Sequence, residues 1–133
     1  MISTQVLELL IAEDERDLRE ILSTHIEENL NVKVHLASNG LEAIEILKMN
    51  KILLIISDLM MPIMGGKELL DYNVKENNLP FILVTATDIS RDPVLSGIKT
   101  YHPSNAIFHK PFSIDLLTSH IDHIIYKEIM RNR

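Results

Sequence analysis

The sequence contains no cysteine and no tryptophan, and its 133 residues include only four glycines and five prolines. Without cysteine the chain forms no disulfide and has no thiolate chemistry, which fits a cytoplasmic location. No apolar run approaches the roughly 20 residues that span a bilayer. The N-terminus also lacks a basic region, and Glu8 interrupts the nearest apolar run, so we expect neither a signal peptide nor a membrane partner.

Basic residues are the minority among the charged side chains. The chain has 13 Lys and Arg against 19 Asp and Glu, which gives a formal net charge of −6. Because binding to phosphate backbones requires a basic surface, this balance argues against nucleic acid as a direct partner. The length fits one domain, and no repeat or linker-like segment divides the chain, so residues 1–133 are expected to form a single domain.

Apolar runs of strand length alternate with segments of helical periodicity. Residues 52–58 contain five consecutive branched apolar residues, which is typical of a strand buried on both faces of a parallel sheet. The other expected strands are residues 6–12, 32–36, 81–84 and 106–109, with 32–36 alternating as an edge strand does. Helical patterns follow at 18–30, 41–47, 66–74, briefly after Asp92, and at 114–129, where the buried stripe is expected to include Ile129. The pattern predicts an α/β fold of (βα)₅ type, a doubly wound five-stranded parallel sheet in the flavodoxin-like order 2-1-3-4-5.

Residues able to carry chemistry stand at the carboxyl ends of these strands. They are Glu13 and Asp14 after the first strand, Asp58 after the third, Thr85 after the fourth and Lys110 after the fifth. In the order 2-1-3-4-5 the first and third strands flank the point where the strand order reverses, which is where such sheets bind ligands. The sequence therefore predicts that three carboxylates, a hydroxyl and an ammonium group share one crevice.

Three carboxylates in one crevice repel one another unless a cation neutralises them. Mg²⁺ suits this set, because it is commonly bound by one or two carboxylates together with waters and phosphate oxygens. Lys110 and Thr85 add a positive charge and a hydrogen-bond donor facing Asp58. This arrangement favours phosphoryl transfer, with Asp58 as the nucleophile.

These residues occur in four motifs that resemble the receiver domain of a two-component response regulator, within the chemotaxis-regulator-like superfamily. The motifs are Glu13-Asp14, Asp58 in the run Asp-Leu-Met-Met-Pro-Ile-Met-Gly-Gly, Thr85-Ala86, and Lys110-Pro111-Phe112. The resemblance implies that Asp14, Asp58 and the main-chain carbonyl of Met60 bind Mg²⁺, with Glu13 acting through water. It also implies a cis peptide bond between Lys110 and Pro111.

The same resemblance implies a function in a phosphorelay. A sensor histidine kinase or a phosphotransfer protein would donate a phosphoryl group to Asp58, and the domain would signal through protein contacts. It would be no enzyme beyond its own phosphorylation and dephosphorylation. The chain departs from the family at the usual aromatic switch position, which is occupied by Ile107, while the neighbouring Phe108 should face the other side of its strand.

The sequence also bears on other functions. An FMN site is disfavoured because Glu13-Asp14-Glu15 would repel its phosphate, and an Asp-x-Asp phosphatase would need an acid where Met60 stands. His120 and His123 have metal-ligand spacing without a third ligand, and the remaining histidines are expected to be solvated. A receiver-like module that no longer uses phosphate, and a receiver excised from a hybrid histidine kinase, both remain open.

Overall fold

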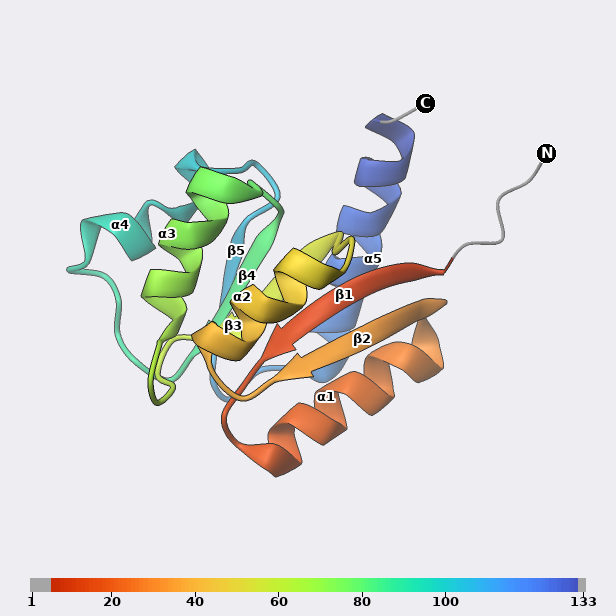
Figure 1. Ribbon diagram of the computed structural model, residues 1–133, viewed down its shortest axis with the longest axis horizontal. Coiled ribbons are helices and arrows are strands. Elements are labelled where there is room, and N and C mark those ends of the chain that lie inside the picture. Colours follow the sequence, from red (N-terminus) through yellow and green to blue (C-terminus); the bar gives the residue numbers. More distant parts are fainter. Residues whose placement is uncertain (1–5, 132–133) are drawn as a thin grey trace.

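The computed structural model describes residues 6–131, in which strands and helices alternate as the sequence predicts (Figure 1). The strands are β1 (Leu7–Ala12), β2 (Val32–Ala37), β3 (Leu54–Asp58), β4 (Phe81–Thr85) and β5 (Ala106–His109). The helices are α1 (Arg16–Asn29), α2 (Gly40–Met49), α3 (Gly66–Glu76), α4 (Pro93–Ser96), the 3₁₀ turn η1 (Ile98–Thr100) and α5 (Ile114–Arg131). All strands pair in parallel in the order β2-β1-β3-β4-β5, which confirms the predicted doubly wound fold.

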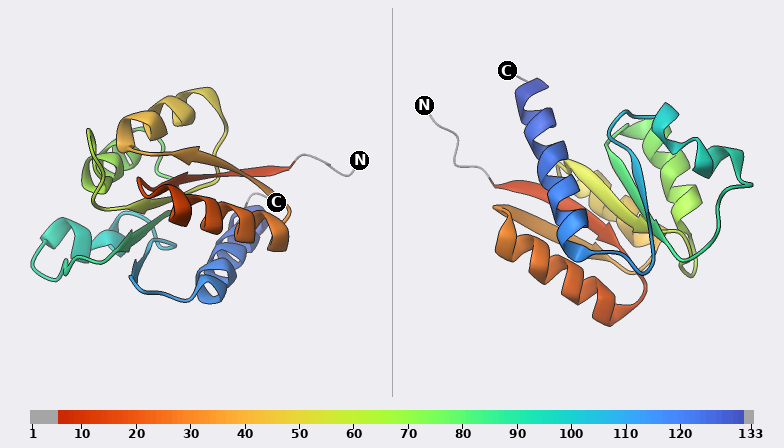
Figure 2. Two further views of the ribbon diagram at one scale, coloured as in Figure 1. Left: turned by 90° about the horizontal axis from the view of Figure 1, so that it is seen from below. Right: turned by 180° about the vertical axis from the view of Figure 1, so that it is seen from behind.

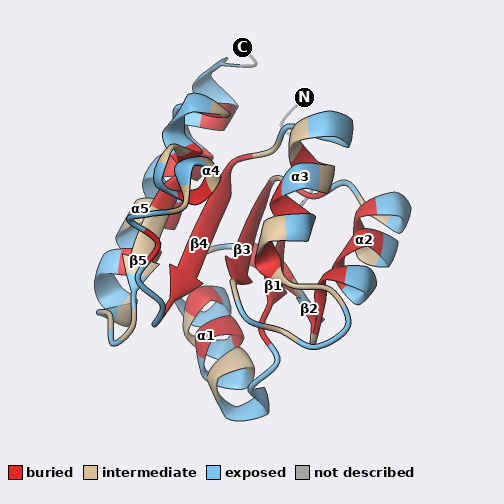
Figure 3. Cartoon of the chain, turned by 90° about the vertical axis from the view of Figure 1, so that its left-hand side faces the viewer, coloured by how far each residue is buried: buried red, intermediate tan, exposed pale blue. Residues whose placement is uncertain are grey.

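The helices cover the sheet from both sides (Figures 1 and 2). Helices α1 and α5 pack on one face, through a cluster that includes Leu22 and Ile26 of α1 and Leu117 and Ile121 of α5. Helices α2 and α3, together with α4 and η1, pack on the other face. Every residue of β3 and β4 is buried, as Figure 3 shows. In β2 at the sheet edge Val32 and Val34 are buried and Lys33 is exposed, but the expected alternation ends at Leu36, which is 40% exposed. The places of the central and edge strands in the sheet were correctly predicted.

The pairing of β1 with β3 fixes the place of the site. Leu9 lies opposite Leu54 and Ala12 lies opposite Ser57, so the two strands end at nearly the same level. β1 pairs with β2 on its other side, so the strand order reverses between β1 and β3. The residues that follow Ala12 therefore emerge beside Asp58.

Local signals set the helix starts. The Asn39 side chain accepts a hydrogen bond of 2.9 Å from the Glu42 amide at the start of α2. Asp92 caps α4 by accepting from the amides of Val94 and Leu95, and Ser113 accepts from the Leu116 amide in α5. Within residues 6–131, no helix is long and apolar enough to cross a membrane.

Two expectations for the C-terminal helix and the histidines were wrong. Ile129 is 46% exposed. The buried row of α5 continues from Ile124 to Glu128 instead, because residues four apart share one helix face and position 129 is rotated away from the sheet. Glu128 faces His102, whose side chain is 6% exposed rather than solvated. The predicted third strand began at residue 52, whereas β3 begins at Leu54. The amide of Leu53, just before β3, donates to the Glu8 carbonyl.

Candidate functional site

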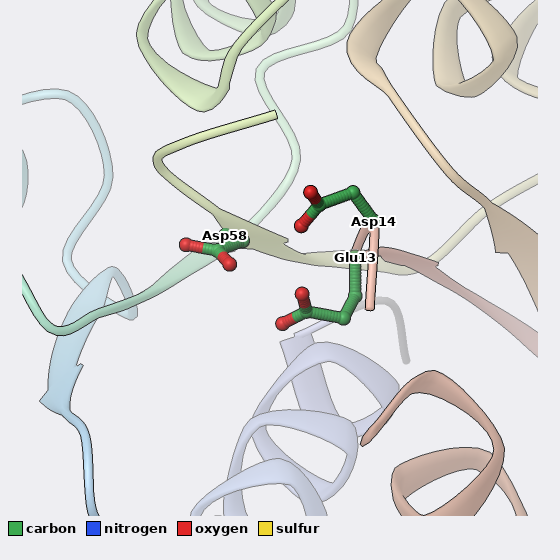
Figure 4. Close-up of side chains that lie close together, drawn as sticks. All are labelled: Glu13, Asp14 and Asp58. Atoms are coloured by element: carbon green, nitrogen blue, oxygen red, sulfur yellow. The ribbon is translucent and has the colours of Figure 1, made fainter. Parts of the chain in front are cut away.

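Three carboxylates meet at the carboxyl ends of β1 and β3, as the sequence predicts (Figure 4). Glu13, Asp14 and Asp58 each offer an oxygen, and these oxygens lie within 4.8 Å of one another. Glu13 and Asp58 are buried at 2% and 8% exposure, while Asp14 is exposed at the mouth of the site. The cluster therefore has one side open to solvent.

Lys110 completes the site from the end of β5. Its Nζ lies 2.9 Å from Oδ2 of Asp58 and 3.1 Å from Oε1 of Glu13. The Lys110 amide donates to the Thr85 carbonyl at 2.8 Å, which ties this residue to the end of β4. The Lys110–Pro111 bond is cis, which agrees with the sequence prediction.

The electrostatics of the cluster centre on Glu13. Burial raises the pKa of Glu13 to about 7, and the nearby charge of Asp58 adds to the rise against the hydrogen bonds from Glu15 and Lys110. Burial would lower the pKa of Lys110, but its hydrogen bonds to Asp58 and Glu13 outweigh this and raise it. One ammonium group thus pairs with two of the three carboxylates, and an additional cation would relieve the remaining repulsion.

The donor set fits a hard divalent cation. All three side chains offer carboxylate oxygens, and the exposed Asp14 leaves a path from solvent. The resemblance implies that the Met60 carbonyl is a direct ligand beside Asp14 and Asp58, with Glu13 acting through water. At Met60 the structure records a different contact, from the amide to Oδ1 of Asp58 at 3.3 Å. That amide holds the Asp58 carboxylate, and the role of the Met60 carbonyl stays a prediction.

Thr85 is fully buried at the end of β4. Its Oγ1 accepts a hydrogen bond of 2.9 Å from the Thr87 amide, so in this structure the hydroxyl oxygen is engaged with its own loop. Lys110 and Asp58 are therefore joined directly, while Thr85 is placed next to them through the backbone.

The loop after Asp58 depends on Gly66, where α3 begins. A Cβ at this position would collide with the Asp58 carbonyl oxygen and lie 2.9 Å from Cα of Leu59. The Gly66 amide instead donates to the Leu59 carbonyl at 2.8 Å. The absence of a side chain thus allows α3 to start directly against the backbone of the candidate nucleophile.

Arg19 belongs to the site and was missed in the sequence. Its Nη1 donates to the Glu13 carbonyl at 2.8 Å and to the Asp14 carbonyl at 3.4 Å, which holds the acidic turn from α1. The Glu15 amide adds a bond of 3.1 Å to the Glu13 carboxylate. The sequence contained one signal for this contact, because Arg19 lies in the first turn of the helix that follows the acidic pair Glu13-Asp14.

The side chains of β5 point as the sequence predicts. Ile107 packs with the cluster that contains α2, α3 and α4, and Phe108 packs on the opposite face with α1 and α5. The Phe108 ring meets Phe112 edge-on, with 6.2 Å between centroids. The Phe108 ring therefore lies on the opposite face of the sheet from Ile107, which occupies the expected switch position.

A flavodoxin-like sheet with three carboxylates and a lysine at its switch point defines a class of α/β domain built for a cation and a phosphoryl group. The chain belongs to the response regulator receiver domain family, whose sequence profile matches residues 9–122.

Curated relatives agree with this assignment. The chain is 36% identical over 124 residues to the "Probable transcriptional regulator ycf27" of Cyanidium caldarium, an alignment that covers 93% of this chain and 48% of that protein. It is 30% identical over 125 residues to "Response regulator Rre1" of a Synechocystis strain, covering 92% of this chain and 53% of the relative. The chain thus spans about half the length of these relatives.

Solved structures show the same fold. The receiver domain of the Francisella response regulator 1452 superposes with a TM-score of 0.78 at 30% identity, covering 92% of this chain and 98% of that one. The response regulator TrrA from Thermotoga maritima, in complex with Mg²⁺ and BeF, gives a TM-score of 0.74 at 24% identity, covering 90% and 99%. At that identity the second likeness shows the fold alone.

Proposed function

We propose that Asp58 accepts a phosphoryl group from a phosphohistidine of a sensor histidine kinase or a phosphotransfer protein. One observation carries the proposal: the Asp58 carboxylate lies 2.9 Å from the Lys110 ammonium and within 4.8 Å of two further carboxylates. A lone carboxylate after a strand would have no such surroundings. This constellation suits a nucleophile whose product carries extra negative charge.

The step balances with the groups at hand. An Asp58 oxygen attacks phosphorus, the phosphorus–nitrogen bond of the donor breaks, and its electron pair stays on the imidazole of the partner. Lys110 then pairs with an oxygen of the transferred group, which gives its ammonium a new partner beside Glu13. Thr85, released from the Thr87 amide, donates its hydroxyl to another phosphoryl oxygen.

Mg²⁺ would be held by Asp14, Asp58 and the Met60 carbonyl, with Glu13 acting through water. When bound, it neutralises charge on the carboxylates and on the transferring phosphoryl oxygens. The support for this assignment is the geometry of the cluster, in which Glu13, Asp14 and Asp58 bring oxygens within 4.8 Å of one another. Burial, aided by the nearby charge of Asp58, raises the pKa of Glu13 to about 7, and a bound cation would favour its charged form.

The scope of the proposal is one receiver domain, residues 1–133, that acts in the cytoplasm and has no enzymatic activity beyond its own phosphorylation and dephosphorylation. Its output passes through protein contacts. The relative from Cyanidium caldarium is named a probable transcriptional regulator, which links that protein to transcription, a link that the net charge of −6 did not suggest for this chain. For this domain itself we keep the expectation of no direct nucleic-acid contact.

Intact-mass spectrometry with acetyl phosphate tests the assignment. We expect one phosphoryl group on the wild type with Mg²⁺, none on Asp58→Asn, and none in EDTA. Asp71→Asn, which changes an exposed carboxylate on α3, is the matched control and should be modified like the wild type. Modification that persists in Asp58→Asn would show that another residue is the acceptor. An unmodified wild type would favour the receiver-like module that no longer uses phosphate.

A further inference from the structure

An ion pair joins α3 to α4, which lie next to each other in Figure 1. The Lys67 ammonium lies 2.7 Å from Oδ2 of Asp92. The hydrogen bond between them raises the pKa of Lys67 and lowers the pKa of Asp92, so both groups are charged at neutral pH. The other oxygen of Asp92 accepts from the amides of Val94 and Leu95, at 3.0 and 3.1 Å. A single carboxylate therefore both caps α4 and attaches it to α3.

The Lys67 end of this pair is held beside the proposed phosphorylation site. The preceding residue, Gly66, packs so closely on Asp58 that a Cβ there would collide with the Asp58 carbonyl oxygen. The Gly66 amide also donates to the Leu59 carbonyl at 2.8 Å, which fixes the first turn of α3 to the loop after β3. Lys67 thus extends toward α4 from a turn that rests on the backbone of Asp58.

A second contact holds the loop between β4 and α4. The Thr87 amide donates at 2.9 Å to Oγ1 of Thr85, the hydroxyl that would turn toward a phosphoryl group on Asp58. When Thr85 leaves this contact, the loop loses the hydrogen bond that ties it to the end of β4. Within residues 6–131, the next polar contact along the chain between this loop and another element is the pair of Asp92 with Lys67.

The exposure of the pair suits a contact that opens and closes. The Lys67 side chain is 45% exposed and that of Asp92 is 25% exposed, so water can replace either partner at small cost. The ion pair near the other end of the segment 88–104, between His102 and Glu128 of α5, has side chains that are only 6% and 10% exposed. Breaking that buried pair would leave polar groups unsatisfied in the interior, so the α3 side of the segment opens more readily.

We propose that the Lys67–Asp92 pair holds residues 88–104 in their resting position. Phosphorylation of Asp58 opens the pair and frees the segment. This opening rests on the proposed function, because it needs a phosphoryl group on Asp58 to move Thr85. A contact that is made only in the resting state lowers the affinity of the site for a phosphoryl group, and by linkage its loss raises that affinity.

Beryllofluoride, a mimic of the phosphoryl group, tests this linkage. Lys67→Met removes the positive charge and keeps an unbranched side chain, while Asp92→Asn removes the negative charge and keeps an oxygen that can cap α4. Each variant should bind beryllofluoride with Mg²⁺ about threefold more tightly than the wild type in a fluorine NMR titration. The double variant should show no further gain, because both substitutions break the same contact.

Two lysine variants are the controls. Lys67→Arg keeps the charge and should bind beryllofluoride like the wild type. Lys75→Met changes an exposed lysine in the last turn of α3 that has no ion pair in the described part of the chain, and it should also match the wild type. Amide hydrogen exchange without beryllofluoride reads the contact directly, and residues 88–104 should exchange about threefold faster in Lys67→Met than in Lys75→Met.

The outcomes distinguish this linkage from the proposed function. A wild type that binds no beryllofluoride contradicts phosphorylation of Asp58. A wild type that binds it, with unchanged or lower affinity in Lys67→Met and Asp92→Asn, overturns the linkage and leaves the phosphorylation site in place. Gains that multiply in the double variant would show that the two residues act separately, which also overturns it.

Discussion

Asp14 and Lys110 bring opposite charges to the same site. Asp14 is the exposed member of the acidic cluster and adds only negative charge. Lys110 supplies the positive charge, at 2.9 Å from Asp58 and 3.1 Å from Glu13. A bound metal ion would therefore neutralise the same carboxylates as Lys110, and substitutions at the two positions should separate metal binding from the response to phosphorylation.

We predict that Asp14→Ala abolishes Mg²⁺ binding, lowering the affinity by at least about 100-fold because a direct ligand is lost. Lys110→Ala should keep metal binding and weaken the structural change that follows phosphorylation, because the phosphoryl oxygens lose their cationic partner. Metal titration followed spectroscopically measures both. Asp17→Ala, an exposed carboxylate in the first turn of α1, is the control. Equal affinities of the wild type and Asp14→Ala would refute the assigned roles.

At the scale of elements, the segment from Asp88 to Ser104 contains only short helical pieces. It contains a helix of only four residues, α4, followed by the three-residue turn η1. The segment is held by four buried side chains, those of Ile89, Leu95, Ile98 and His102. An ion pair of 2.7 Å also joins Asp92 to Lys67 of α3. Because its helices have only four and three residues, few regular backbone hydrogen bonds oppose a rearrangement of this segment.

We predict that phosphorylation reorders this segment. Thr85 should move toward the phosphoryl group, and Ile107 is too short to fill the space as an aromatic ring would. Amide hydrogen exchange with beryllofluoride should therefore change most between residues 88 and 104. The same mixture with Asp58→Asn should produce no change. Protection that changes only around Asp58 would rule out this route.

At the scale of the whole molecule, His102 links the end of η1 to α5. Its Nδ1 accepts a hydrogen bond of 3.0 Å from the Ser104 amide, and its Nε2 lies 3.4 Å from Oε1 of Glu128. Burial lowers the pKa of His102, and Arg131 lowers it further against the opposing effect of Glu128. Burial also lowers the pKa of His120, whose ring packs against Phe108.

This has a predictable consequence for stability. The unfolded chain protonates these histidines near their ordinary pKa of about 6.5, while the folded protein resists protonation to lower pH. Stability is therefore fully present above that range and is lost as the pH falls below it. Chemical denaturation between pH 8 and about pH 5 should show a shallower loss for His102→Gln than for the wild type. His109→Gln, an exposed histidine, should behave as the wild type.

Glu13 changes the pH dependence of stability in the opposite direction, so the two histidine variants are compared with each other. Its raised pKa means that, without metal, its contribution to stability falls as the pH rises from 4.5 to about 7. That effect is common to both histidine variants and cancels between them. If His102→Gln and His109→Gln give the same pH dependence as the wild type, His102 is not the buried group that the geometry indicates.

The sequence by itself determined the order and type of the elements. The continuous apolar run of β3 and the caps at Asn39, Asp92 and Ser113 are local patterns, and the structure contains each of them. The alternation in β2 is present from Val32 to Val34 and ends at the exposed Leu36. Right-handed parallel crossovers leave few ways to connect such elements. Because parallel strands end at one edge, the residues after β1, β3, β4 and β5 could be assigned to one site before any contact was known.

Only the tertiary structure decided the contacts that depend on how helices settle on the sheet. Arg19 binds the Glu13 carbonyl, and His102 meets Glu128, because separate elements are brought together by packing that no local pattern encodes. Helix α5 shows this most clearly. Its sequence contains two apolar rows, and the fit against the sheet buries the one through Leu117 and Ile124 while it leaves the row through Leu116 and Tyr126 in solvent.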